Sequence, residues 1–156
     1  MRLLDLIRGK LVIPSLRAQE KRAAIEEIVD FLVDAGAISK EVRPFIAKAV
    51  HGREDFMSTG MEHGIALPHG VTDRVDEELA AIGISKKGIE FESYDQRPAQ
   101  IMILLLTPAH LALTRVRTLA EIARIVNDAT VRNALIASQT VEDAVKVLKA
   151  ANARQK

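Results

Sequence analysis

The sequence predicts an α/β domain in which helices pack on both sides of a central group of strands. Segments with helical periodicity lie before about residue 51 and again after Pro108. Between them are short apolar stretches bounded by glycine, proline or charged residues, a pattern typical of buried strands. Of the 156 residues, 48% are hydrophobic, which suffices for a folded core, and we expect residues 1–156 to form a single domain.

The N-terminal third predicts two helices preceded by shorter elements. Residues 3–7 are interpreted as a short helix or a docking segment, and residues 11–16 as an edge strand that tolerates its proline. Apolar residues at helical spacing predict a helix over residues 20–35. A second helix is expected from about residue 40 to residue 51, with an early proline and with Phe45 on its apolar side.

Three apolar stretches predict the strands of the sheet. They are GIALPHG (residues 64–70), LAAIGIS (residues 79–85) and QIMILLLTP (residues 100–108). The longest purely apolar run, residues 101–106, is too short to cross a bilayer. The stretch GISKKG, residues 83–88, is interpreted as a solvated basic hairpin turn rather than a phosphate-binding loop.

Helical periodicity returns after Pro108. Apolar residues from Val116 to Val126 form one stripe and predict a helix there. Asp128 is expected to start a short helix, and Thr140 to cap the last one. The final residues, 151–156, are expected to fray.

Composition and charge exclude several classes of function. The net charge is +1, which gives no pull toward nucleic acid or a membrane surface, and aromatic residues make up only 3%. The chain has no cysteine, which excludes disulfides, zinc ribbons and thiol catalysis. Its N-terminus lacks the features of a signal peptide. We therefore expect a cytoplasmic protein that neither binds nucleic acid nor inserts into a membrane.

Common cofactor and metal motifs are also missing from the sequence. It contains no Gly-x-x-x-x-Gly-Lys-Ser/Thr, no Gly-x-Gly-x-x-Gly, no His-Glu-x-x-His and no nucleophile elbow. The four histidines, His51, His63, His69 and His110, form no helical i, i+4 pair. We therefore expect no cofactor and no metal site.

The stretch GIALPHGV, residues 64–71, places one histidine between two residues with special backbone properties. Pro68 fixes its own φ and restricts the residue before it. Gly70 lets the chain turn and lets another molecule approach the backbone. This combination would present His69 at the end of a strand, where functional groups often lie. An ordinary turn that happens to contain a histidine is the alternative.

The window REDFMSTGMEHGIALPHG, residues 53–70, resembles the active-site region of enzyme IIA components of the bacterial phosphotransferase system, fructose/mannitol type. This type includes the nitrogen-regulatory IIA proteins. The matching positions are Arg53, residues 58–60, residues 64–66 and residues 68–70. The similarity continues through FESYDQRPAQIMILLLTP and LAEIARIVNDATVRNAL and covers nearly the whole chain. It implies the fold of that family, with a central mixed β-sheet flanked by helices.

The resemblance implies that His69 is the catalytic residue. It would accept a phosphoryl group on Nε2 from a histidine-containing phosphocarrier protein and pass it on. A neutral imidazole is nucleophilic near pH 7, and a hydrogen bond to its other nitrogen would fix the tautomer. Such a transfer needs in-line positioning and stabilisation of the charge on the phosphoryl oxygens.

The same resemblance makes Arg53, Ser58 and Thr59 candidates for stabilising the phosphate. Arg53 could supply a bidentate cation, and the two hydroxyls, with nearby backbone N–H groups, could supply neutral donors. Each has a plainer alternative. Arg53 could form a surface ion pair with Glu54 or Asp55, and residues 58–60 could be only a turn.

This sequence departs from the family pattern at one position of the site. Many family members carry a second active-site histidine near the start of the helix after the last core strand, and the alignment puts Arg115 there. His110, five residues earlier, is the candidate for a second histidine. Arginine cannot shuttle a proton, but it can hold a phosphate. We predict that Arg115 and Arg53 bracket the phosphate on His69; a solvated arginine in the first helical turn is the alternative to this role for Arg115.

The expected partners are the phosphocarrier protein and either a IIB component or a regulatory target protein. Met57, Met61 and Leu67 are candidates for an apolar docking surface around His69, although any of them could belong to the core. A nitrogen-regulatory role is favoured over sugar transport, because no IIB or membrane domain is attached in this sequence. A binding module of the same fold that transfers nothing is the alternative function, and a phosphoesterase is a third.

Overall fold

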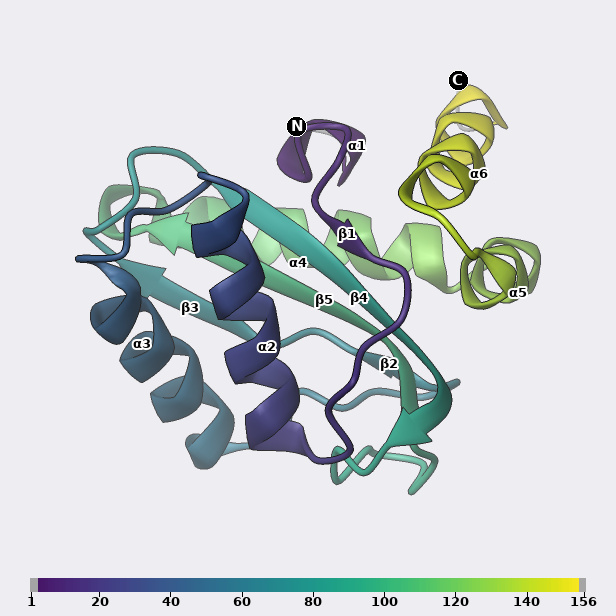
Figure 1. Ribbon diagram of the computed structural model, residues 1–156, viewed down its shortest axis with the longest axis horizontal. Coiled ribbons are helices and arrows are strands. Elements are labelled where there is room, and N and C mark those ends of the chain that lie inside the picture. The colour runs from purple at the N-terminus through teal and green to yellow at the C-terminus, as the bar shows by residue number, and fades with distance from the viewer. Residues whose placement is uncertain (1–2, 155–156) are drawn as a thin grey trace.

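The computed structural model describes residues 3–154, and it has the predicted α/β architecture (Figure 1). The elements in chain order are α1 (Leu3–Leu6), β1 (Val12–Ile13), α2 (Lys21–Asp34), α3 (Arg43–Phe56), β2 (Ile65–Ala66), β3 (His69–Thr72), β4 (Leu79–Ile89), β5 (Ala99–Pro108), the 3₁₀ helix η1 (Ala109–Leu111), α4 (Ala112–Val126), α5 (Ala129–Ala137) and α6 (Val141–Arg154). Among these residues, no helix is both long and apolar enough to cross a membrane.

The strands form one mixed sheet in the order β1-β4-β5-β2, with β3 also paired to β5. β1 runs parallel to β4, β4 antiparallel to β5, and both β2 and β3 parallel to β5. β2 and β3 follow one another along the same edge of β5, since Ile65 lies opposite Ile101 and His69 opposite Leu105. The two short strands are therefore one edge interrupted at Leu67 and Pro68. The mixed sheet implied by the family resemblance is confirmed.

Helices cover both faces of the sheet. α2 and α3 lie in front of it in Figure 1, and α4 lies behind it. The central strands β4 and β5 supply most of the sheet's core residues; Ile82 and Ile103, for example, are fully buried opposite each other. Each such side chain contributes about 1.5–3 kcal/mol through burial. This core fixes the sheet edge and α3, the two elements that meet at His69.

Both predicted helix starts in the C-terminal part are confirmed. The Asp128 carboxylate accepts the Thr130 N–H at 2.8 Å at the start of α5. The Thr140 hydroxyl accepts the Asp143 N–H at 3.0 Å at the start of α6. Of the tail expected to fray, residues 151–154 belong to α6, and residues 155–156 lie outside the described part.

The second helix lies further along the chain than predicted. Residues 39–42 form a turn in which the Val42 N–H donates to the Ser39 carbonyl, and α3 then runs from Arg43 to Phe56. Its early proline fits the first turn of a helix, which explains the late start. The placement of Phe45 on the apolar side was also wrong, because 47% of its surface is exposed. The Arg74 guanidinium lies 3.9 Å from the centre of that ring.

Two other interpretations were wrong. Residues 83–88 do not form a hairpin turn, because β4 continues through them to Ile89 with an irregular register after Ile84. Lys86 and Lys87 are nevertheless exposed, as expected. Val116 is 64% exposed, so the apolar stripe of α4 begins later than predicted.

Candidate active site

His69 is the first residue of β3 and lies directly after the break in the sheet edge. Only 7% of its surface is exposed. Its Nδ1 lies 2.8 Å from the Leu67 carbonyl oxygen, which can only accept. Nδ1 therefore carries the proton, and the lone pair is left on Nε2. The geometry holds the ring in the tautomer that a nucleophilic Nε2 requires.

The surroundings of His69 keep its ring neutral. Burial lowers the pKa of His69 from its ordinary value of 6.5, and the positive charges of Arg53 and Arg115 lower it further. The hydrogen bond to Leu67 and the negative charge of Glu54 act in the opposite direction. Since the net shift is downward, the surroundings favour the neutral imidazole.

Gly70 lets α3 pack directly on β3. A Cβ atom at this position would lie 3.2 Å from both the Cβ and the carbonyl carbon of Ala49 in α3. The expected turn at Gly70 is wrong, because the residue lies inside β3, and the molecule that approaches its backbone is the protein's own helix. Arg53 follows Ala49 by four residues and lies on the same face of α3. This packing therefore brings Arg53 to the histidine.

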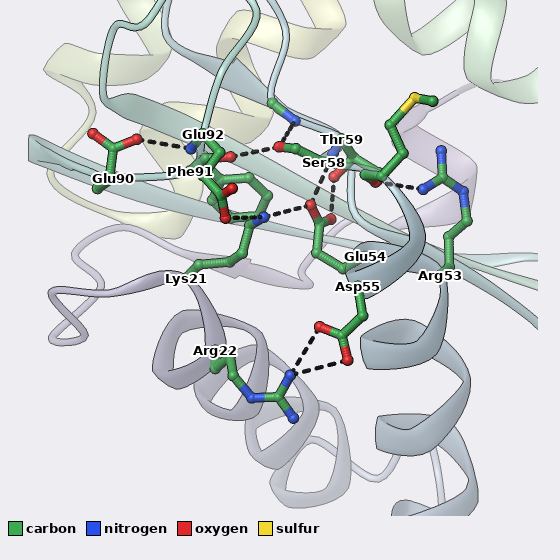
Figure 2. A network of polar contacts seen from close by, with 12 residues as sticks. Lys21, Arg22, Arg53, Glu54, Asp55, Ser58, Thr59, Glu90, Phe91 and Glu92 are labelled. Carbon is green, nitrogen blue, oxygen red and sulfur yellow. Dashed lines mark hydrogen bonds and ion pairs between the residues drawn. The ribbon is translucent and has the colours of Figure 1, made fainter.

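Arg53 does not form the surface ion pair considered as its alternative role. Glu54 pairs with Lys21 at 2.9 Å and Asp55 pairs with Arg22 at 3.1 Å (Figure 2). Arg53 Nη1 donates to the Met57 carbonyl at 2.6 Å. The guanidinium is half-buried and has no acidic partner within 4.0 Å among residues 3–154.

Arg115 lies in the first turn of α4 and is half-buried. Its Nε is buried without a hydrogen-bond partner, and within the described residues no carboxylate pairs with it. Its charge acts on the pKa of His69, as that of Arg53 does. Two uncompensated cations beside a neutral imidazole make a site suited to an anion such as a phosphoryl group. His110 lies in η1 and is exposed.

Ser58 and Thr59 lie in the loop after α3, and their hydroxyl protons are donated within the fold. The Ser58 hydroxyl donates to the Phe91 carbonyl at 2.5 Å, and the Thr59 hydroxyl donates to Glu54 at 2.5 Å. The Thr59 carbonyl accepts the Leu67 N–H at 3.1 Å. The loop thus supports the segment that carries His69.

The sequence interpretation considered Glu54 only as a partner for Arg53, and it did not include Lys21 in the site. Glu54 is 4% exposed and belongs to the buried face of α3 with Ile46 and Val50. Glutamate is almost never fully buried unless it is paired. The i, i+4, i+8 spacing from Ile46 through Val50 to Glu54 was a signal in the sequence that could have identified it.

Apolar side chains and a groove lie around the site. Met57 is exposed and Met61 partly so, whereas Leu67 is buried and belongs to the core. An open groove of about 530 Å³ lies between α3, β3 and η1, with Arg53 and Val71 among its lining residues. No group of three potential metal-ligating side chains is present among the residues that the structure describes.

The comparison with known proteins identifies the family of this chain. The family model described as "Phosphoenolpyruvate-dependent sugar phosphotransferase system, EIIA 2" matches residues 5–151. A fructose-specific EIIA component from Haloferax volcanii is 33% identical over 126 residues, which cover 79% of this chain and 80% of that protein. A nitrogen regulatory protein from Bradyrhizobium diazoefficiens is 26% identical over 148 residues, which cover 95% of both chains.

A solved structure has the same fold. In the complex of enzyme IIA mannitol and phosphorylated enzyme IIB mannitol from Escherichia coli, the matching chain superposes with a TM-score of 0.73 at 20% identity, covering 90% of this chain and 94% of that chain. With the family model matching from Asp5 to Ala151, this chain belongs to the EIIA 2 family of the phosphoenolpyruvate-dependent sugar phosphotransferase system.

Proposed function

We propose that this protein is a phosphocarrier whose His69 accepts a phosphoryl group from a histidine-containing phosphocarrier protein. Nε2 attacks the phosphorus atom of the donor's phosphohistidine. The bond from phosphorus to the donor nitrogen breaks as the new bond to Nε2 forms, and its electron pair stays on the donor imidazole. The observation that carries this proposal is the Nδ1–Leu67 hydrogen bond of 2.8 Å, which leaves Nε2 free in a site with two unpaired arginines.

In this proposal Arg53 and Arg115 hold the transferred group. Charge on the three phosphoryl oxygens is spread in the transition state, and fixed cations stabilise it without reorganisation. Ser58 and Thr59 stay predicted contributors. Because their hydroxyl protons are already donated to Phe91 and Glu54, we assign them a role through the shape of the loop.

Arg115 in place of the family's second histidine favours retention of the phosphoryl group. A permanently charged guanidinium binds the phosphate but cannot donate or accept a proton during onward transfer. We infer a regulatory role of the nitrogen-regulatory type, which the match over 95% of both chains with the Bradyrhizobium protein supports. His110, exposed in η1, stays a candidate second histidine if onward transfer occurs.

The proposed partners are the donor phosphocarrier protein and one acceptor or target. The solved complex of IIA mannitol with phosphorylated IIB mannitol supports a IIB component as the acceptor. The groove beside Arg53 and the exposed Met57 would contact the donor. We place this protein and its partners in the cytoplasm.

A binding module that transfers nothing is the second candidate function, and the observation favouring it is the arginine at position 115. The experiment is incubation with the general phosphotransferase components and labelled phosphoenolpyruvate. We expect acid-labile, alkali-stable label that His69→Ala removes. No label would support the binding module, and continuous release of free phosphate would support a phosphoesterase.

A further inference from the structure

Glu54 is a buried carboxylate at the centre of a polar network that joins two helices to the loop before β2 (Figure 2). Lys21 Nζ from α2 lies 2.9 Å from its Oε2. The Thr59 backbone N–H donates to Oε2 at 2.8 Å, and the Thr59 hydroxyl donates to Oε1 at 2.5 Å. Since only 4% of its surface is exposed, this carboxylate depends on these partners instead of water.

From Thr59 the network continues to the imidazole through two hydrogen bonds of Leu67. The Leu67 N–H donates to the Thr59 carbonyl at 3.1 Å, and the Leu67 carbonyl accepts the His69 Nδ1 proton at 2.8 Å. Leu67 lies at the break between β2 and β3, so its amide bonds to the loop and not to β5. The loop therefore helps to hold the residue whose carbonyl orients His69.

Arg53, the residue of α3 directly before Glu54, also holds this loop. Arg53 donates to the Met57 carbonyl at 2.6 Å, so consecutive helix residues fix the two ends of residues 57–59. Lys21 is itself confined, because its Nζ lies 5.1 Å from the centre of the Phe91 ring and 3.3 Å from Glu92. The cation that neutralises Glu54 thus cannot move away without losing other contacts.

We propose that Glu54, paired with Lys21, is a positioning residue for His69. It keeps the Leu67 carbonyl where Nδ1 can donate to it, and so keeps Nε2 unprotonated and directed at the incoming group. Glu54 does not contact the imidazole or the phosphate itself. The effect on phosphorylation rests on the proposed function, whereas the effect on the tautomer of His69 does not.

A neighbouring ion pair provides a matched control. Arg22 and Asp55 are the next residues of the same two helices and form an ion pair at 3.1 Å (Figure 2). Their side chains are 59% and 66% exposed, and their ion pair does not include the loop. If the Lys21–Glu54 pair only joined α2 to α3, removing either ion pair should affect His69 equally. If the pair positions His69, only substitutions of Glu54 and Lys21 should affect the ring.

The first measurement is the ¹⁵N spectrum of the His69 ring in the unphosphorylated protein at neutral pH. The wild type should show Nδ1 protonated and Nε2 not. Glu54→Gln should shift the ring toward the opposite tautomer, which a free histidine side chain favours in water. Asp55→Asn and Arg22→Met should leave the spectrum unchanged. A folded Glu54→Gln protein with the wild-type ring spectrum would overturn the proposal.

If Glu54→Gln does not fold, the same ring spectrum of Lys21→Met tests the proposal, because this variant keeps the carboxylate but removes its main cation. It should produce the same tautomer shift, and Lys21→Arg should restore the wild-type spectrum. A wild-type ring spectrum in Lys21→Met would count against the proposal in the same way.

The second measurement is the rate at which phosphoramidate, a small phosphoryl donor, phosphorylates His69. Its phosphorus–nitrogen bond breaks, ammonia leaves, and the phosphoryl group bonds to Nε2. We expect Glu54→Gln to slow this about tenfold or more, because misplaced groups lose orientation, and Asp55→Asn not to slow it. If the wild type accepts no label from phosphoenolpyruvate and the general phosphotransferase components, the proposed function fails while the tautomer result still stands. A tautomer shift confined to Glu54 and Lys21 variants supports the positioning role in either case.

Discussion

Glu54 and Glu78 are both buried carboxylates near the candidate active site, but only Glu54 has a cation for a partner. Glu54 pairs with Lys21 and accepts two hydrogen bonds from Thr59. Glu78 accepts the hydroxyls of Thr107 at 2.8 Å and Thr118 at 2.6 Å, and in the described part of the chain no basic side chain pairs with it.

The two carboxylates lie close in the chain or fold to different arginines of the site. Glu54 adjoins Arg53 in α3. Glu78 ties β5 to α4 through Thr118, which lies three residues after Arg115 on the same helix. The comparison teaches that a buried ion pair anchors the end of the helix that carries Arg53, whereas neutral hydroxyls anchor the helix that carries Arg115. Substitutions in the two regions should therefore differ in how much they lower the free energy of unfolding and in the direction in which they shift the pKa of His69.

The largest expected effect is on stability at the ion-paired region. Lys21→Met leaves the Glu54 charge buried without its cation, which should lower the free energy of unfolding by about 3–5 kcal/mol. Thr118→Val removes one neutral donor from Glu78 and should lower it by about 1–3 kcal/mol. Urea unfolding followed by circular dichroism measures both. Equal losses would mean that the two carboxylates are supported alike.

The next effect is on phosphoryl transfer. Arg53→Gln and Arg115→Gln should each reduce the rate of His69 phosphorylation by about 10²-fold, because each removes a fixed cation from the developing charge. Arg115→Gln should also shorten the lifetime of the phosphohistidine. Quench-flow labelling and the decay of the isolated phosphoprotein separate the two. An unchanged rate and lifetime in Arg115→Gln would place that arginine outside the site.

A smaller effect, opposite in sign for the two regions, concerns pH. The Arg115 charge lowers the pKa of His69, so Arg115→Gln should raise it toward 6.5 and move the acid limb of the phosphorylation rate to higher pH. The Glu54 charge raises the pKa of His69, so Glu54→Gln should lower it. Titration of the His69 ring by NMR measures both shifts. Shifts in the same direction would contradict this assignment of charges.

The smallest effect is expected at the exposed ion pair beside Glu54. Arg22→Ala should change the free energy of unfolding by less than about 1 kcal/mol, since solvent screens exposed pairs. The same urea experiment measures it. A loss as large as that of Lys21→Met would show that packing of α2 on α3, and not burial of the Glu54 charge, accounts for the first prediction.

The sequence was sufficient for the features that depend on local pattern. Helical periodicity identified α2 and α4, and the strand-like stretch ending in Pro68 and His69 led to the histidine whose pKa is lowered by the charges of two arginines. The Lys-Lys-Gly stretch was misread as a hairpin turn, because β4 continues through it with an irregular register and pairs with β5 again at Ile89. Tertiary pairing overrode the local preference there.

Local sequence pattern could not predict the hydrogen-bond network around Glu54, because this network joins segments that are distant in the chain. Lys21 and Glu54 meet only when α2 packs on α3, and the Thr59–Leu67 bond exists only because the sheet edge is broken at Pro68. Gly70 was correctly singled out, but its neighbour is Ala49 of the same chain. The sequence identifies such residues as unusual, and only the three-dimensional structure shows what they contact.

The break between β2 and β3 has a consequence for recognition. These edge strands contain only two and four residues, separated by Leu67 and Pro68. A foreign polypeptide would find no continuous row of free amides and carbonyls along which to extend the sheet, so templated strand addition and self-aggregation at this edge are disfavoured. Selectivity for the proposed phosphoryl donor would then come from side-chain shape and charge, which can change for a new partner without altering the backbone pairing of the sheet.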